Sequence, residues 1–90
     1  MKLSSRTRYG LRAILELAQN PAAAPLQVKT IAEHQEVSVK YLEQLMSMLK
    51  SAGLVRGIRG SKGGYSLAKP ANLIKTSDIF HHLNPYYRRI

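Results

Sequence analysis

Between residues 27 and 52, hydrophobic residues recur at helical spacing in two successive segments. In the second segment, apolar side chains at the i, i+3, i+4, i+7 spacing predict a helix over about 39–52 with one buried side. The residues of this stripe are Tyr41, Leu42, Leu45, Met48, Leu49 and Ala52. In the first segment, Val28, Ile31 and Ala32 predict a shorter helix over about 27–35. Two short helices joined by a tight turn form a helix-turn-helix pattern.

The residues between these two helices suit a tight turn. Val37 is expected to pack into the corner, and the Ser38 hydroxyl can cap the second helix by accepting a backbone N–H. Glu36 falls where a positive φ is common, at a cost of about 1–2 kcal/mol for a residue other than glycine. Gly53 follows the second helix and is expected to end it in the left-handed conformation.

The flanking sequence predicts one helix before this pair and a hairpin and a further helix after it. Ser4 or Ser5 can cap a first helix that runs to about residue 20, and Thr76 can cap a last helix to about Leu83. Two strands, 54–59 and 65–69, surround a glycine-rich loop and predict a β-hairpin. The core positions expected from these elements are Leu11, Ala13, Ile14, Leu15, Leu17, Ala18, Leu54, Ile58, Tyr65, Leu67, Leu73, Ile74, Ile79, Phe80 and Leu83.

These elements predict a mainly α fold with a two-stranded β wing, the winged helix-turn-helix. We expect one domain over residues 1–84 and a C-terminal tail over 85–90. The chain has 90 residues and no cysteine, which excludes disulfides, thiolate chemistry and cysteine-ligated metals or clusters. No apolar run approaches the roughly 20 residues that span a bilayer, and no secretory signal is evident, so we expect a cytoplasmic protein.

Charge is the strongest global feature of the sequence. Fourteen Lys and Arg against five Asp and Glu give a net charge of +9, which indicates a polyanionic partner. The region from Gln44 to Ser77 contains basic residues and no acidic residue. The glycine cluster in this region could also suggest a nucleotide-binding loop. That interpretation is weak, because Lys62 is followed by Gly63-Gly64 and a strand rather than by Ser or Thr and a helix.

The face of the second helix opposite its apolar stripe carries donors and acceptors suited to base edges in a major groove. This face comprises Lys40, Glu43, Gln44, Ser47 and Ser51, with Ser38 at its start. An ordinary solvated helix is the alternative interpretation. Cations of the other elements could hold phosphates, and the basic hairpin could lie along a minor groove. The candidate positions are Arg6, Arg8, Lys29, Thr30, Lys50, Arg56, Arg59 and Lys62.

Catalytic chemistry and metal binding find little support. Of the three histidines, His81 and His82 are adjacent and cannot chelate one ion from one side of a helix. Asp78 and His82 have the i, i+4 spacing of a two-ligand clip, which alone is weak support for a metal site. The sequence shows no catalytic constellation, so we expect no enzyme activity, no metal and no cofactor.

Four motifs resemble a known family of bacterial transcription factors. They are MKLSSRTRYGLRAILELA at the start, IAE-x-x-x-VS-x-x-YLEQL over residues 31–45, L-x-x-AGLV over 49–55 and RG-x-KGGY-x-LA over 59–68. Over residues 1–83 the sequence resembles winged-helix regulators of the IscR/NsrR/CymR type. The resemblance implies a homodimer on a pseudo-palindromic operator, with Lys40, Glu43 and Gln44 in the major groove and Arg59 at the minor groove.

The sequence departs from this family in several places. Family members continue into a long dimerisation helix, and the sensing members carry three cysteines for an iron–sulfur cluster. This sequence stops at Ile90 without either feature, and Arg8 stands where nitric-oxide-sensing members place an acidic cluster ligand. We therefore expect neither cluster binding nor dimerisation through that helix.

The leading hypothesis is a sequence-specific double-stranded-DNA-binding regulator, expected to be a repressor. In this hypothesis, helix 38–52 enters the major groove and the wing over 54–69 lies on the minor groove. The alternative is a winged-helix interaction module that binds an acidic protein. An RNA-binding role is less favoured, because Tyr65 alone could stack a base near the basic surface.

Overall fold

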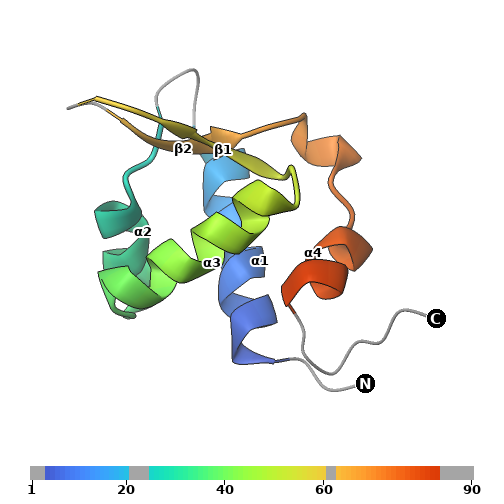
Figure 1. Ribbon diagram of the computed structural model, residues 1–90, viewed down its shortest axis with the longest axis horizontal. Coiled ribbons are helices and arrows are strands. Elements are labelled where there is room, and N and C mark those ends of the chain that lie inside the picture. Colours follow the sequence, from blue (N-terminus) through green and yellow to red (C-terminus); the bar gives the residue numbers. More distant parts are fainter. Residues whose placement is uncertain (1–3, 21–24, 61–62, 84–90) are drawn as a thin grey trace.

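The structure is a computed structural model that describes residues 4–20, 25–60 and 63–83 (Figure 1). Within these residues the chain forms four α-helices, a two-stranded antiparallel sheet and a short 3₁₀ helix. In chain order the elements are α1 (Ser5–Gln19), α2 (Val28–Gln35), α3 (Val39–Ser51), β1 (Val55–Ile58), β2 (Gly64–Leu67), η1 (Ala71–Leu73) and α4 (Thr76–Leu83). The predicted winged helix-turn-helix is confirmed, whereas η1 was not predicted. The tail over 85–90 lies outside the described residues.

The inner face of α3 forms the centre of the hydrophobic core. Leu42, Leu45 and Leu49 are buried, as the helical spacing predicts, and Met46 beside them is buried as well. Met46 was missing from the predicted stripe, although it lies one turn after Leu42 on the same side of the helix. The core around α3 is completed by Ile31, Ala32, Leu54, Val55, Ile79 and Leu83. α3 crosses in front of α1, so its opposite face is turned outward (Figure 1).

The buried face of α1 differs from the predicted stripe. Ala13, Ile14 and Leu17 are buried as expected and Leu11 is half-buried. The prediction was wrong for Leu15, which is 49% exposed, and for the exposed Ala18. The small residues Thr7 and Gly10 are buried instead. Leu83 of α4 lies so close to Gly10 that a Cβ atom there would overlap the leucine side chain. Close packing against small residues therefore decides which side of α1 faces the core.

The caps of α1 and α3 and the turn between α2 and α3 follow the sequence prediction. The Ser4 hydroxyl accepts the Thr7 N–H at 3.1 Å, and the Ser38 hydroxyl accepts the Tyr41 N–H at 3.0 Å. Glu36 adopts the left-handed conformation, with φ of 57° and ψ of 42°. Gly53 after α3 also has a positive φ, of 78°. Of these residues, Glu36 and Ser38 lie in the turn that joins α2 to α3.

The start of α4 departs slightly from the prediction that Thr76 caps it. Thr76 is already the first helical residue, so Lys75 occupies the cap position. The Lys75 backbone N–H donates to the Asp78 carboxylate at 3.0 Å, in the reverse half of a capping box. This hydrogen bond is the main reason why the pKa of Asp78 is lowered from its usual value.

The wing is paired to the segment that leads into α2. β1 and β2 are antiparallel, with Val55 opposite Leu67 and Ile58 opposite Gly64. Leu26 forms an additional bridge with Tyr65, through two backbone hydrogen bonds of 2.9 and 2.8 Å. At Gly64 a Cβ atom would overlap the Leu26 carbonyl, so this close approach requires glycine. The bridge holds the wing beside the start of α2.

Three hydrophobic residues of the hairpin and its C-terminal flank are more exposed than predicted. Ile58 is 39% exposed, because strand alternation places it with Arg56 on the outward side while Val55 is buried. Leu73 is 56% exposed in η1, whereas the neighbouring Ile74 packs against the core. Tyr65 is only half-buried. The core predictions for Ile58 and Leu73 were therefore wrong.

Candidate nucleic-acid interface

The outward face of α3 carries the polar side chains that the helical pattern placed there. Lys40, Glu43, Gln44, Ser47 and Ser51 are all exposed, on the side opposite the buried leucines. Ser38 is exposed too, but its hydroxyl oxygen already caps the helix. The result is a convex polar surface about four turns long that begins at the N-terminus of α3. Its shape and its side chains suit insertion into a major groove.

Apart from Ser38, the polar side chains of this face have no partner within the described part of the chain. Lys40, Glu43, Gln44 and Ser47 make no side-chain hydrogen bond or ion pair with another described residue. No Lys or Arg in the described ranges forms an ion pair with another described residue. The one salt bridge in these ranges joins Glu16 and His34. The donors and cations of this surface are therefore available to an external partner, and a net charge of +9 favours a polyanion.

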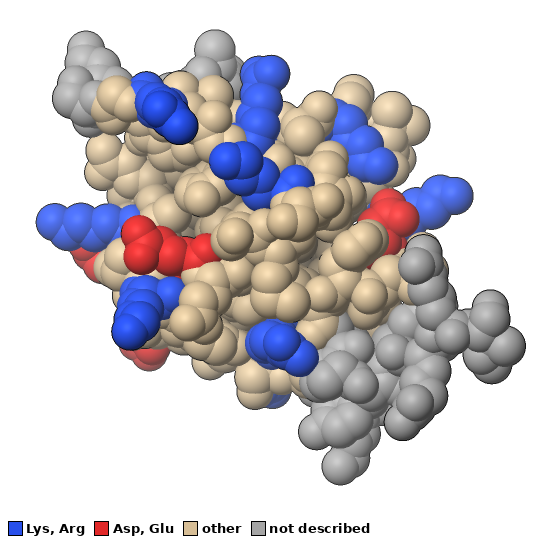
Figure 2. All heavy atoms as spheres, viewed as in Figure 1, with Lys and Arg blue, Asp and Glu red and all other residues tan. Residues whose placement is uncertain are grey.

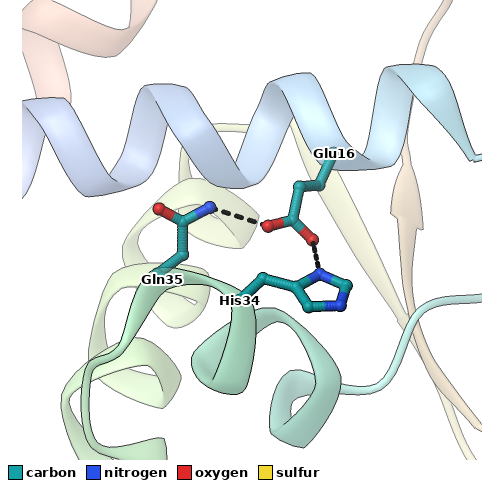
Figure 3. Close-up of polar contacts among 3 residues, drawn as sticks. All are labelled: Glu16, His34 and Gln35. Atoms are coloured by element: carbon teal, nitrogen blue, oxygen red, sulfur yellow. Dashed lines mark hydrogen bonds and ion pairs between the residues drawn. The ribbon is translucent and has the colours of Figure 1, made fainter.

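A polar contact between α1 and α2 orients the helix-turn-helix (Figure 3). Gln35 at the end of α2 donates its side-chain N–H to Glu16 Oε1 at 2.7 Å. His34 Nδ1 lies 3.0 Å from Glu16 Oε2. Glu16 thus anchors the C-terminal end of α2, from which the turn leads into α3. Sequence reasoning missed this contact, because the partners lie on different helices and no local spacing relates them.

The wing places two arginines beside the C-terminal end of α3. Arg56 and Arg59 are exposed, and Figure 2 shows Lys and Arg side chains gathered over the wing and the adjoining end of α3. A groove of about 320 Å³ separates the last turns of α3 from the hairpin. Its lining residues are Lys50, Gly57, Ile58, Arg59, Gly64 and Tyr65. Lys62, predicted to contact phosphate, lies outside the described residues.

The other predicted phosphate positions lie at the starts of α1 and α2. Arg8 and Lys29 are exposed, and Arg6 and Thr30 are half-buried. The first turns of α1, α2 and α3 contain no acidic residue, although the helix dipole would favour one. The Leu26–Tyr65 bridge brings the start of α2 close to the wing. The first turn of α1 lies at the end of the molecule opposite the wing, and α3 crosses between that turn and the wing (Figure 1).

The residues considered as metal ligands are used in other contacts. His82 Nδ1 lies 2.8 Å from the backbone oxygen of Asp78, while the Asp78 carboxylate accepts the Lys75 N–H. These contacts use Nδ1 of His82 and one carboxylate oxygen of Asp78. In the described ranges, no three His, Cys, Asp or Glu residues gather as a ligand set. Nor is any described helix long and apolar enough to cross a membrane.

Comparisons with known proteins agree with the motifs and the fold. The chain is 42% identical over 83 residues to the protein rrf2 of Nitratidesulfovibrio vulgaris, covering 92% of the chain and 55% of that protein. It is 45% identical over 83 residues to the HTH-type transcriptional regulator CymR of Bacillus subtilis, covering 92% of the chain and 60% of CymR. The chain therefore spans little more than half the length of these curated relatives.

Solved structures give the same result. The structure of B. subtilis CymR, the global cysteine regulator, aligns with a TM-score of 0.88 at 43% identity, covering 93% of the chain and 65% of CymR. The structure of T. potens IscR aligns with a TM-score of 0.84 at 41% identity, covering 100% of the chain and 66% of IscR. A family model described as "Rrf2: Iron-dependent Transcriptional regulator" matches residues 3–87. These matches confirm the resemblance to regulators of the IscR/CymR type: the chain belongs to the Rrf2 family.

Proposed function

We propose that this chain binds double-stranded DNA and recognises a specific operator sequence as part of a transcriptional regulator. The main support is the outward face of α3, whose polar side chains have no partner among the described residues. The basic wing beside it and the net charge of +9 supply the attraction for phosphates. The regulators named among the relatives share the fold that presents this surface.

The proposed contacts divide into base recognition and phosphate binding. Gln44 can donate to and accept from adenine, and Glu43 can accept from the amino group of cytosine. Lys40 lies on the same face for a guanine or a phosphate, and Arg59 extends from the wing to a minor groove. The remaining residues position the protein on the backbone. This second group comprises Arg6, Arg8, Lys29, Thr30, Lys50, Arg56 and Lys62.

The family description mentions iron, and the residues described here do not fit an iron site. The sequence contains no cysteine, and the described residues offer no set of three potential ligands. We therefore propose that this chain recognises DNA without a metal or cluster of its own. Repression as the outcome, a two-copy complex on a pseudo-palindromic operator and a cytoplasmic location remain predictions of the same proposal.

The proposal is tested by selecting bound sequences from a random pool of duplexes. We expect enrichment of one sequence, and an affinity for it that falls steeply with salt, with a log–log slope of about −0.9 for each phosphate contacted. Binding without enrichment would refute sequence recognition. A complex with an acidic protein that is indifferent to added duplex would instead support the interaction-module alternative.

A further inference from the structure

Val39 is an exposed aliphatic residue at the edge of the polar outward surface of α3. Its side chain is 42% exposed and does not belong to the hydrophobic core, whereas Val37, two residues earlier, packs against that core. Val39 is the first residue of α3, directly after the Ser38 cap. Around the helix axis it lies about 40° from the exposed Glu43 and about 20° from the buried Met46, so it stands at the border between the outward and the buried faces. Because it is exposed at the first position of α3, Val39 forms the N-terminal edge of the surface proposed to enter the major groove.

The position of Val39, more than its exposure, is informative. Single exposed aliphatic residues are common on protein surfaces. The large hydrophobic side chains exposed in the described part are Leu15, Val39, Ile58 and Leu73, and of these only Val39 lies on α3. A valine here also does little for the helix, because β-branched residues are weak helix formers and the dipole favours an acidic residue in the first turn. Neither core packing nor helix stability accounts for this side chain.

We propose that Val39 contacts the C5-methyl group of a thymine in the operator and is a specificity-determining residue. This inference rests on the DNA-binding function proposed above. The thymine methyl is the apolar group that base edges present in the major groove, and small apolar side chains are its usual partners. Residues at the N-terminus of a recognition helix are the ones that approach base edges most closely.

The geometry of α3 also locates this thymine. Glu43 follows Val39 by four residues, which is about 6 Å along the helix axis. Successive base pairs are separated by about 3.4 Å. The thymine contacted by Val39 is therefore expected within about two base pairs of the base pair that Glu43 contacts.

The test uses the 90-residue chain and a duplex selected from the random pool. Each thymine of the selected sequence is replaced in turn by deoxyuridine, which removes only the methyl group. We expect one replacement, near the Glu43 position, to raise Kd about three- to fivefold, the effect of losing one buried methyl contact. Val39→Ala is expected to bind the thymine and deoxyuridine duplexes equally, and its exposed site leaves the fold intact. Leu73→Ala changes an exposed aliphatic residue in η1, away from α3; it is the control and is expected to retain the discrimination.

Two results would overturn the inference. One is a selected operator in which no thymine responds to loss of its methyl group. The other is a response that persists in Val39→Ala with circular dichroism and unfolding midpoint unchanged. A failure to enrich any sequence would refute the DNA-recognition proposal itself and this inference with it. The base pair that Glu43 contacts is identified in a separate selection with Glu43→Gln. It is the position at which the sequence selected by this variant differs from the one selected by the original chain.

Discussion

α1 and α3 start alike and then differ on both faces. A serine caps each helix by accepting a backbone N–H three residues on. On the inside, α1 contributes small residues beside two large aliphatic ones, whereas every buried side chain of α3 is large and apolar. On the outside, Glu16 of α1 binds two residues of α2, and Arg12 lies over the Tyr9 ring at 5.6 Å. The outward polar residues of α3 have no such contacts among the described residues.

This difference separates a scaffold helix from a candidate interface helix. Both helices are amphipathic, so amphipathicity alone does not distinguish them. In α1 the carboxylate of Glu16 is turned toward α2 and holds the C-terminal end of that helix, from which the turn leads into α3. In α3 the inward face anchors the helix and leaves the outward face unconstrained. A surface whose hydrogen-bonding groups are unused within the protein is the better candidate for recognition of a partner.

The largest expected effect contrasts the inner face of α3 with the outer face of α1. Leu45→Ala leaves a cavity in the core and should lower the free energy of unfolding by about 2–5 kcal/mol. Leu15→Ala removes the same atoms from an exposed position and should change it by less than about 0.5 kcal/mol. Urea titrations monitored by circular dichroism measure both values. Equal losses of stability in the two variants would contradict the exposed position of Leu15 on α1.

A smaller effect is expected at the two serine caps. Ser4→Ala should lower the free energy of unfolding by about 2 kcal/mol, at the upper end for caps, because it also leaves the buried Thr7 hydroxyl without its 2.9 Å partner. Ser38→Ala removes a solvent-exposed cap and should cost about 1 kcal/mol. The same titrations test the order. A larger cost at Ser38 would contradict the added role of the Ser4–Thr7 hydroxyl contact in α1.

The smallest effect is expected at the residue that joins α2 to α3. Glu36→Gly relieves the strain of the left-handed conformation, and glycine also increases the conformational entropy of the unfolded chain, which offsets part of this gain. The free energy of unfolding should therefore rise by about 1 kcal/mol. Glu33→Gly makes the same substitution inside α2 and should lower it by about 1 kcal/mol. Thermal unfolding of the two variants provides the comparison. A loss of stability at both positions would contradict the conformation of Glu36.

The helix-turn-helix was predictable because its signals are local. Large aliphatic residues at helical spacing define the buried face of α3, and Ser38 marks its start within a few residues. The buried face of α1 was not predictable in this way, because the packing of Gly10 depends on Leu83 at the other end of the chain. The exposure of Ile58 follows from strand alternation counted from the buried Val55, and the sequence alone did not specify which side of this strand faces the core.

The candidate site was predictable in part for the same reason. A helical wheel correctly identifies which side chains of α3 face outward. It cannot identify the Glu16 contact that orients α2, or the Leu26–Tyr65 bridge that holds the wing, because both join residues distant in sequence. The contacts assigned to individual residues on DNA remain predictions, since they depend on the operator as much as on the chain.

The most direct test of the account compares Gln44→Ala with Lys29→Met on the selected operator and on a scrambled duplex. Gln44→Ala should reduce the preference for the operator by about 1–3 kcal/mol and leave binding to the scrambled duplex unchanged. Lys29→Met should weaken binding to both duplexes equally and lower the salt slope by about 1. If Gln44→Ala instead weakened binding to both duplexes to the same extent, the outward face of α3 would not be the surface that recognises sequence.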